Sequence, residues 1–320
     1  MPKTTVVIPN YNGIAYLKKC LASLEKQTVE IQVVVIDNGS HDGSSEWLTK
    51  QEWITSILLP ENTGFCGAVN LGIEKSRTEY VYLLNNDTEI ELDCIEQLEQ
   101  ILDSDKKIFS VGAKMLSLHQ PELIDDAGDF YCALGWAFAR GKGKSAGQYH
   151  KCDRIFSACG GAVLYRRDVF AEIGVFDENH FAYLEDTDMG YRARIFGYQN
   201  VFAPKAIVYH AGSAVSGSRY NAFKVDLSSR NSVYLIYKNM PLLQIFLNLP
   251  FLIIGFGIKI LFFYRKGLGT CYVKGLLRGI QMSSSAKGRQ HKVPFQWKHM
   301  GNYLKIQWEL WWNIVRRLQG

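Results

Sequence analysis

Four short apolar runs alternate with three helix-like segments in the first part of this 320-residue chain. The runs are rich in β-branched and aromatic residues and end in turn-forming groups, whereas the segments between them repeat apolar residues at helical spacing. Strands that alternate with helices run parallel and are joined by right-handed crossovers. The sequence therefore predicts an α/β fold with a doubly wound, mainly parallel sheet. The predicted strands cover residues 4–9, 31–36, 54–59 and 80–84.

Polar side chains follow three of these strands at their carboxyl ends. Ligands of open parallel sheets bind outside the carboxyl ends of the strands, and carboxylate and amide oxygens suit hard cations. The pattern predicts a ligand and cation site on one rim of the sheet, although an Asn-rich turn explains residues 85–88 taken alone. The polar groups are Asn10, Asn12, Asp37, Asn85, Asn86 and Asp87.

The middle of the chain predicts a helix at 93–102, a strand at 108–115 and a second strand at 157–166 with Gly160 and Gly161 inside it. Glycines in a strand let a ligand approach the backbone closely. The segment 125–149 is rich in glycine, aromatic and basic residues and predicts an excursion or hairpin. A surface insertion and a substrate-covering loop are equally good interpretations of that segment.

Three carboxylates, Glu185, Asp186 and Asp188, precede a predicted helix at 189–196. Acids are favoured in the first turn of a helix, so a capping role accounts for one or two of them. Three in four residues exceed what a cap requires, and we expect at least one to take part in chemistry. His210 ends the last predicted strand, 200–209, and is a candidate metal ligand.

Charge is distributed unevenly along the chain. From Arg265 to the end there are eleven basic residues and one acid, Glu309, so the rest of the chain is net acidic. A basic tail on an acidic body predicts an anionic partner for the tail, such as an anionic membrane surface. The seven cysteines include no C-x-x-C pair, which argues against a zinc site or a disulfide framework. Together with the absence of an apolar leader at the N-terminus, this favours a cytosolic protein.

Residues 242–264 form an apolar segment long enough to span a bilayer, interrupted by Pro250, Gly255, Gly257 and Lys259. A single span would place either the acidic body or the basic tail outside, whereas basic residues prefer the cytoplasmic side. We therefore expect a re-entrant or in-plane element at the cytoplasmic face of the membrane. A helical hairpin folded on the rest of the chain, or a dimer contact, is the alternative.

A second amphipathic helix is predicted at 302–318. Tryptophan and arginine on such a helix suit the headgroup region of a membrane. The predicted apolar face consists of Leu304, Trp308, Trp311, Val315 and Leu318, with Lys305, Glu309, Asn313 and Arg316 opposite.

Seven motifs occur in an order that resembles the inverting family 2 glycosyltransferases of GT-A fold, most closely the bacterial rhamnosyltransferases of polysaccharide and O-antigen assembly. The resemblance covers about residues 4–240. It implies a catalytic domain at 1–240, with a nucleotide-sugar half at about 1–115 and an acceptor half at about 116–240, and a helical membrane-associating region at 241–320. The motifs are TVVIPNYNG, VVIDNGSHDGS, ENTGFCGAVNLG, LLNNDTEI, GGAVLYRRDVFAEIGVFDE, YLEDTDMGYR and YHAGS.

The resemblance also implies roles for individual residues. Asp186 takes the place of the general base, and Asp87 and His210 take the places of metal ligands. Asn85 stands where the family's D-x-D motif has its first acid, so the protein shell is thin and the donor diphosphate must supply oxygens to Mg²⁺ or Mn²⁺. The expected substrate-binding residues are Pro9, Asn10, Tyr11, Asp37, Asn62, Gly64, Asn70, Asn85, Asn86, Gly160, Gly161 and Glu185.

The implied reaction moves a sugar, with L-rhamnose from dTDP-rhamnose favoured, to a polyprenyl-diphosphate-linked or growing glycan acceptor. The cation offsets charge on the leaving diphosphate, and the carboxylate base takes the acceptor proton during a direct displacement that inverts the anomeric centre. No nucleic acid partner is expected, and a homodimer is possible.

Four alternatives stay open. The same reaction with a UDP- or GDP-sugar is one, and a catalytically silent carbohydrate- or lipid-binding scaffold is another, because Asn85 replaces an acid. A nucleotidyltransferase would be expected to carry basic residues in the loop 9–13, which has none. A dinucleotide-binding oxidoreductase is disfavoured because no G-x-G-x-x-G follows the first strand.

Overall fold

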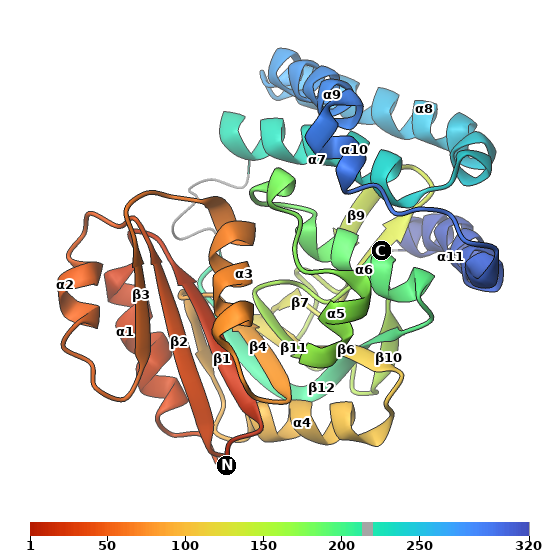
Figure 1. The fold of residues 1–320 in the computed structure, drawn as a ribbon. Helices are drawn as coiled ribbons and strands as arrows, with labels where there is room; N and C mark the ends of the chain where they lie inside the picture. The colour runs from red at the N-terminus through yellow and green to blue at the C-terminus, as the bar shows by residue number, and fades with distance from the viewer. Residues whose placement is uncertain (213–219, 320) are drawn as a thin grey trace.

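The computed structural model describes residues 1–212 and 220–319. A single large sheet forms the centre of the protein, with its strands in the order β10-β12-β6-β11-β4-β1-β2-β3 and with β5 and β7 paired to β12 and β6 (Figure 1). The strands are β1 (Thr4–Asn10), β2 (Ile31–Asn38), β3 (Thr55–Leu59), β4 (Tyr80–Leu84), β5 (Thr88–Ile90), β6 (Ile108–Ser117), β7 (Ile124–Asp126), β8 (Asp129–Cys132), β9 (Trp136–Ala139), β10 (Asp153–Ile155), β11 (Ala162–Arg166) and β12 (Gln199–His210).

Helices lie on both faces of this sheet. The α-helices are α1 (Ile14–Leu24), α2 (Ser44–Leu48), α3 (Gly64–Lys75), α4 (Cys94–Ser104), α5 (Phe170–Ile173), α6 (Glu185–Ile195), α7 (Ala222–Asn239), α8 (Leu242–Arg265), α9 (Gly269–Ser284), α10 (Ala286–Gln290) and α11 (Met300–Leu318). Short 3₁₀ turns occur at Arg167–Val169, Glu178–His180 and Trp297–His299.

The predicted parallel sheet is confirmed. Strand β1 lies between β2 and β4 and is parallel to both, and β3 is parallel to β2. Strand β11 runs antiparallel between β4 and β6, and β12 is parallel to β6. All four N-terminal strands therefore end at the same edge of the sheet, where the polar residues of the sequence were expected.

The two faces of the sheet bury different side chains because successive residues of a strand point in opposite directions. In β1, Val6 and Ile8 pack with the apolar residues of α1 and α4, whereas Val7 packs with α3 on the other face. Burial on both sides explains why the parallel strands are continuous apolar runs rather than alternating ones.

Two of the differences between predicted and observed element boundaries affect the polar residues of the site. Strand β11 begins only at Ala162, so Gly160 and Gly161 precede the strand, in a turn closed by a hydrogen bond from the Ala162 N–H to the Cys159 carbonyl. Helix α6 begins at Glu185 rather than at Met189, so the three acids form its first turn, where the helix dipole favours negative charge.

The segment 125–149 contains a two-stranded antiparallel hairpin, β8–β9, outside the main sheet. Its side chains share an apolar cluster with α6, α7, α8 and α11. The hairpin touches α8 at Gly255, where a Cβ atom would lie 2.1 Å from the Leu134 carbonyl oxygen, and the Trp136 indole N–H donates to the Gly255 carbonyl. A glycine is needed at this position for the two backbones to meet.

Helix α8 is continuous through Pro250, so this residue interrupts the apolar run without ending the helix. Among the described residues it is the one helix long and apolar enough to cross a membrane by length and composition, and only 17% of its most apolar window is buried. Its outer face is instead an exposed apolar surface, with Phe246, Ile253 and Leu261 each more than half exposed.

Helix α11 has one face against the protein and one face outward. Tyr303, Ile306 and Leu310 are buried in the cluster with the hairpin, and the buried Asn313 side chain donates to the Tyr131 carbonyl. The expected placement of Asn313 on the exposed polar face is therefore wrong. The predicted apolar face is confirmed. It points outward, away from the buried face, and Trp308 on it is 68% exposed.

A buried ionic network joins α6 to α7. The Lys238 ammonium lies 2.9 Å from carboxylate oxygens of both Asp177 and Asp188, and Arg192 pairs with Asp188 at 2.8 Å. Burial raises the pKa of Asp188, but Arg192 and Lys238 outweigh burial and hold that pKa well below its ordinary value. Because all these side chains are nearly inaccessible to solvent, removing one leaves an uncompensated buried charge.

We predict that Lys238→Met lowers the free energy of unfolding by about 3 kcal/mol, because Asp177 and Asp188 lose their shared cation. Urea unfolding at neutral pH measures the change. Lys75→Met, at an exposed position of α3, is the control and is expected to shift stability by no more than about 0.5 kcal/mol. Equal unfolding midpoints for the two variants would contradict the network.

Candidate active site

A chain of side-chain hydrogen bonds connects the carboxyl ends of β4, β1 and β2. The Asn86 amide donates to Asn10 Oδ1 at 2.7 Å, and the Asn10 amide donates to Asp37 Oδ1 at 2.8 Å. Asn10 and Asp37 are also direct partners in the parallel register of β1 and β2. The structure thus brings together three of the residues that the sequence placed on one rim.

Asp37 is completely buried and its carboxylate accepts several hydrogen bonds. The hydroxyl of Ser40 donates to Oδ1 and the hydroxyl of Ser45 donates to Oδ2. Tyr11 and Pro9 lie at the same strand end, and Tyr11 is exposed. In this structure Asp37 fixes the strand-end loops, and its predicted contact with a nucleotide stays a prediction.

The loop before α3 is also held by amide side chains. Asn62 Oδ1 accepts from the Asn38 amide and from the Gly64 N–H. Gly64 has φ +80°, and a Cβ there would lie 2.6 Å from the Phe181 ring, so only glycine fits. Asn70 makes paired hydrogen bonds with the backbone of Phe176, which positions the segment before α6. The predicted substrate contacts of Asn62, Gly64 and Asn70 stay predictions.

Asp87 and His210 meet although they are far apart in the sequence. Strand β5 pairs antiparallel with β12, with Thr88 opposite His210, and the Ala211 N–H donates to the Asp87 carbonyl. This pairing places His210 Nε2 at 3.3 Å from Asp87 Oδ1. The two expected metal ligands therefore lie side by side.

Asp125 holds the other side of the His210 ring. Its Oδ2 lies 2.8 Å from His210 Nδ1. Burial lowers the pKa of His210, but the hydrogen bonds to Asp125 and Asp87 outweigh burial and raise it to about 9. A carboxylate behind a histidine fixes the ring orientation, as commonly seen behind metal-ligating histidines.

The side chains at this point fit a divalent cation that is bound partly by substrate. The Asp87 carboxylate would supply an oxygen ligand, and His210 would supply Nε2 after giving up the proton that its raised pKa holds there, which are ligands of the kind that Mn²⁺ or Mg²⁺ accepts together with phosphate oxygens. Asp87 is only 7% exposed, so the site is a confined one.

Asp186 contacts the same glycine turn as Asn85 does. Its Oδ2 accepts a long hydrogen bond, 3.4 Å, from the Gly160 N–H, while the Gly161 carbonyl accepts from the Asn85 N–H at 2.9 Å. A Cβ on Gly161 would lie 3.0 Å from the Asn85 amide, so this glycine allows close contact of the two segments. Burial is the main cause that raises the pKa of Asp186 above its ordinary value.

Glu185 is buried beside Asp186, and its Oε2 has no hydrogen-bond partner among the described residues. Burial and the charge of Asp186 raise the pKa of Glu185 to about 8. Its carboxyl therefore keeps its proton to higher pH than an exposed glutamate does. Asp188, the third acid of the group, belongs to the ionic network with Lys238 and faces away from this chemistry.

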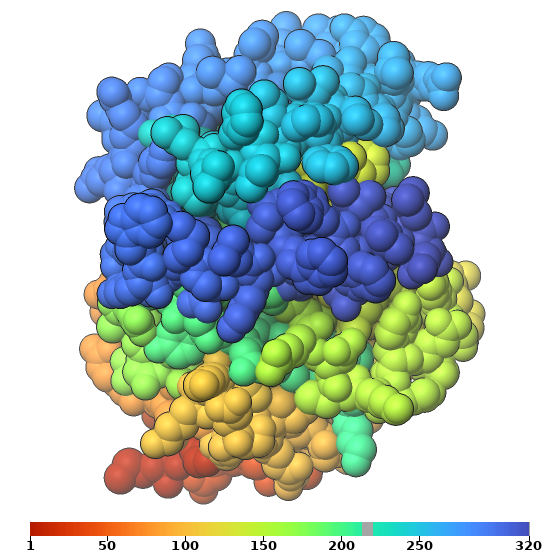
Figure 2. Space-filling model, turned by 90° about the vertical axis from the view of Figure 1, so that its right-hand side faces the viewer, coloured from red at the N-terminus to blue at the C-terminus, as the bar shows by residue number. Residues whose placement is uncertain are grey.

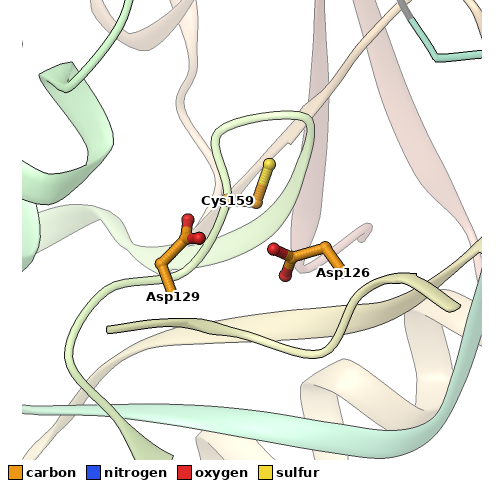
Figure 3. A group of neighbouring side chains, drawn as sticks. All are labelled: Asp126, Asp129 and Cys159. Atoms are coloured by element: carbon orange, nitrogen blue, oxygen red, sulfur yellow. The ribbon is translucent and has the colours of Figure 1, made fainter. Parts of the chain in front are cut away.

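A further group of side chains near Asp186 was missed by sequence reasoning. Asp126, Asp129 and Cys159 come from β7, β8 and the loop before β11, and their ligand atoms lie within 4.8 Å of one another (Figure 3). Burial is the main cause that raises the pKa of Asp126 to about 7, with the charges of Asp125 and Asp186 adding to it. Burial and Asp126 raise the pKa of Asp129 well above its ordinary value.

The pKa values of all three side chains in this group are raised, mainly by burial. Burial also raises the pKa of the Cys159 thiol well above its usual range, so the sulfur stays protonated and is a poor metal ligand. A protonated carboxyl beside Asp186 can donate a hydrogen bond to a hydroxyl. The clue in the sequence was the density of acids in Asp125, Asp126 and Asp129, inside a segment interpreted as an insertion or loop.

Comparisons with known proteins relate the chain as a whole to known families and folds. Residues 5–174 match the model of Glycosyl transferase family 2. An N-acetylglucosaminyl-diphospho-decaprenol L-rhamnosyltransferase of Mycobacterium tuberculosis is 28% identical over 233 residues, which cover 64% of this chain and 75% of that protein. Glycosyltransferase GlyA of Streptococcus pneumoniae is 37% identical over 100 residues, 30% of this chain and 14% of that protein.

Solved structures share the fold. GalNAc-T7 with UDP, GalNAc and Mn²⁺ superposes with a TM-score of 0.59 at 16% identity over 74% of this chain, which spans about half, 48%, of that structure. The mannosyltransferase PcManGT of Pyrobaculum calidifontis, in complex with GDP-Man and Mn²⁺, gives a TM-score of 0.53 at 16% identity, covering 96% of this chain and 86% of that one. The expected GT-A fold is confirmed.

We predict that the stability of the protein depends on pH through Glu185. Because its pKa is raised on folding, the folded state keeps a proton that the unfolded chain has lost, so stability falls as pH rises from about 4.5 to about 8. Glu185→Gln removes this penalty. The variant should gain at least about 1 kcal/mol relative to the native chain between pH 5 and pH 8, the equivalent of one pKa unit.

Urea unfolding of both proteins at the two pH values measures this difference. Glu46→Gln, at an exposed position of α2, is the control and should change stability equally at both. A Glu185→Gln variant whose stability relative to the native chain is the same at both pH values would show that Glu185 ionises freely in the folded protein.

Proposed function

The chain belongs to Glycosyl transferase family 2 and is a glycosyltransferase, and from this premise we propose that it transfers a sugar with inversion from a nucleotide donor to a lipid-linked or polysaccharide acceptor. The observation that supports the proposal best is the contact of Asp87 with His210, together with the hydrogen bonds that join the turn at Gly160 and Gly161 to both Asp186 and the Asn85 backbone. The candidate metal ligands and the candidate base thus come from segments that contact one another.

The donor half of the reaction uses Asp87 and His210. They would hold a divalent cation, Mn²⁺ or Mg²⁺, and this cation offsets the negative charge that develops on the leaving nucleoside diphosphate. Asp125 positions the His210 ring through its hydrogen bond to Nδ1. Asp87 and His210 would be few protein ligands for a cation, so we expect weak cation affinity in the absence of nucleotide.

The acceptor half uses Asp186. As the acceptor oxygen attacks the anomeric carbon, the bond from that carbon to the diphosphate oxygen breaks and the acceptor proton passes to the Asp186 carboxylate. The raised pKa of Asp186 makes it a better proton acceptor than an exposed aspartate. Asp126 and Asp129, whose pKa values are raised mainly by burial, lie close to Asp186 and would form part of the polar surface that the acceptor meets.

L-Rhamnose from dTDP-rhamnose is the donor we favour, and a polyprenyl-diphosphate-linked glycan is the acceptor. The support is the mycobacterial relative, whose name states both the sugar and the lipid-linked acceptor. Release of nucleoside diphosphate from a panel of dTDP-, UDP- and GDP-sugars with Mn²⁺ and a lipid-linked N-acetylglucosamine acceptor tests the choice. Turnover with a UDP- or GDP-sugar alone would replace rhamnose, and no release with any donor would favour the silent scaffold.

We predict that Asp186→Asn lowers kcat by about 10²- to 10⁴-fold, because an amide cannot accept the proton of the acceptor. Binding of the donor, measured by calorimetry with nucleoside diphosphate and Mn²⁺, should persist. Asp168→Asn, in the short 3₁₀ turn after β11, is the control for loss of one charge and should keep normal turnover. Turnover of the Asp186→Asn variant within about threefold of normal would refute its role as base.

We predict that Asp125→Asn weakens Mn²⁺ binding in the presence of nucleoside diphosphate by about 10- to 100-fold, because the His210 ring loses the carboxylate that orients it. Electron paramagnetic resonance of free Mn²⁺ measures the affinity directly. Asp103→Asn, which breaks the surface pair with Lys3, removes the same charge far from the site and should leave the affinity unchanged. Equal Mn²⁺ affinities in both variants would contradict the role of Asp125.

We also propose that the C-terminal helices associate with the cytoplasmic face of the membrane. The support is the exposed apolar face of α8 together with the exposed tryptophans of α11 and the basic residues around them. Flotation with vesicles that contain phosphatidylglycerol should carry the protein upward. Changing Phe246 and Ile253 to serine should abolish flotation, and unchanged flotation of that variant would show that α8 lies elsewhere.

A further inference from the structure

A basic groove lies between the β8–β9 hairpin, the second half of α8 and the end of α11. Its volume is about 950 Å³, and residues from all three elements line it. In Figure 2 the yellow residues of the hairpin are visible between the dark-blue α11 and the cyan α8 above it. None of the roles given above for donor, base or cation uses the groove as a whole.

Several cations in the groove have no carboxylate partner within the described part of the chain, and three of them, Lys259, Arg316 and Arg317, stand at the hairpin. Each is placed over an aromatic ring of the hairpin instead. Lys259 Nζ lies 5.7 Å from the centre of the Trp136 ring, Arg316 lies 4.7 Å from that of Phe130, and Arg317 lies 5.5 Å from that of Phe138. Rings that hold the cations in place keep their charge available for an anion.

The acids in the groove wall are already neutralised. Asp153 pairs with Arg140, and Asp125 pairs with Lys142. The Arg140 side chain is only 10% exposed, and among described residues its buried Nη2 has no hydrogen-bond partner. The groove therefore carries a clear excess of positive charge, including guanidinium donors of the kind that bind phosphate oxygens in pairs.

One end of the groove opens onto the apolar surface of α8. Phe262 and Phe263 line the groove, and Ile258 and Leu261 continue the same helix outward with about half or more of their surface exposed. A ligand with a phosphate group in the groove could thus lay an apolar chain along α8 without crossing polar surface.

The other end reaches the candidate active site. Asp125 lines the groove and also holds His210 Nδ1 at 2.8 Å. The next residue, Asp126, lies near enough to Asp186 for the two charges to affect each other. A sugar attached to an anion in the groove would therefore point toward the base.

We propose that this groove binds the diphosphate and the first isoprenoid units of a lipid-linked acceptor. The inference rests on the proposed function, since it places the acceptor of that reaction. The diphosphate lies against Lys259, Arg316 and Arg317, and the chain follows α8 toward the membrane. The groove continues to Asp125 at the candidate active site. This continuity favours a lipid-linked acceptor, which must reach the active site, over a bulk phospholipid, which need not.

Calorimetric titration of the full chain with farnesyl diphosphate tests the proposal. The titration contains EDTA and no donor, so that no cation can bridge the diphosphate to Asp87. Inorganic pyrophosphate is titrated in parallel. We expect farnesyl diphosphate to bind at least about tenfold more tightly than pyrophosphate, because only the lipid reaches the aromatic wall and α8. Equal affinities, or no binding of farnesyl diphosphate, would overturn the proposal.

Two double variants, each of which removes two positive charges, distinguish binding in the groove from a general effect of net charge. Arg316→Gln with Arg317→Gln should weaken farnesyl diphosphate binding at least tenfold. Arg265→Gln with Lys266→Gln, exposed at the end of α8 and outside the groove, should weaken it less than twofold. Lys259→Gln provides an independent single variant, and thermal unfolding of each protein shows whether it is folded.

Flotation distinguishes the acceptor from a bulk lipid. Both double variants should float equally on phosphatidylglycerol vesicles. If only the groove variant loses flotation and both bind farnesyl diphosphate alike, the groove is a headgroup site and the proposal is wrong. The titration needs neither donor nor turnover, so it tests the groove independently of the proposed sugar transfer. Transfer to a soluble glycan without binding of farnesyl diphosphate would overturn the groove proposal but not the proposed function.

Discussion

The parallel pairing of β1 with β2 and β4 is the constraint on which the rest of the structure depends. It brings Asn10, Asp37 and Asn86 into one hydrogen-bonded chain at the edge of the sheet. From that edge the chain continues directly through Asp87 into β5, whose pairing with β12 returns His210 to the same place. The candidate active site is thus assembled by backbone pairing, which fixes the positions of its side chains relative to one another.

Much of this assembly was readable in the sequence. Buried parallel strands are apolar and end in polar turns, so the strands and the rim residues followed from local pattern. Asp87 and His210 each stand at a strand end, which made both predictable as candidates. Their contact, however, depends on a pairing between distant strands that no local pattern encodes.

The residues that escaped prediction share one property, namely that their role depends on long-range packing. Asp125 reaches His210 Nδ1 because strand β7, which contains Asp125, pairs with β6. Asp126 and Asp129 matter because burial beside Asp186 changes their protonation. Asn70 binds the Phe176 backbone, a contact between distant segments that no local pattern predicts.

The ionic network around Lys238 has a mechanical consequence for the proposed reaction. Asp188, which anchors α6 to α7, stands two residues after Asp186 on the same helix, and α7 leads directly into α8. Asp186 and α8 are therefore joined through buried ionic contacts and a short stretch of chain. If α8 rests on a bilayer as proposed, this connection sets the height of Asp186 above the lipid, and that height would limit how far from its lipid anchor a sugar acceptor can react.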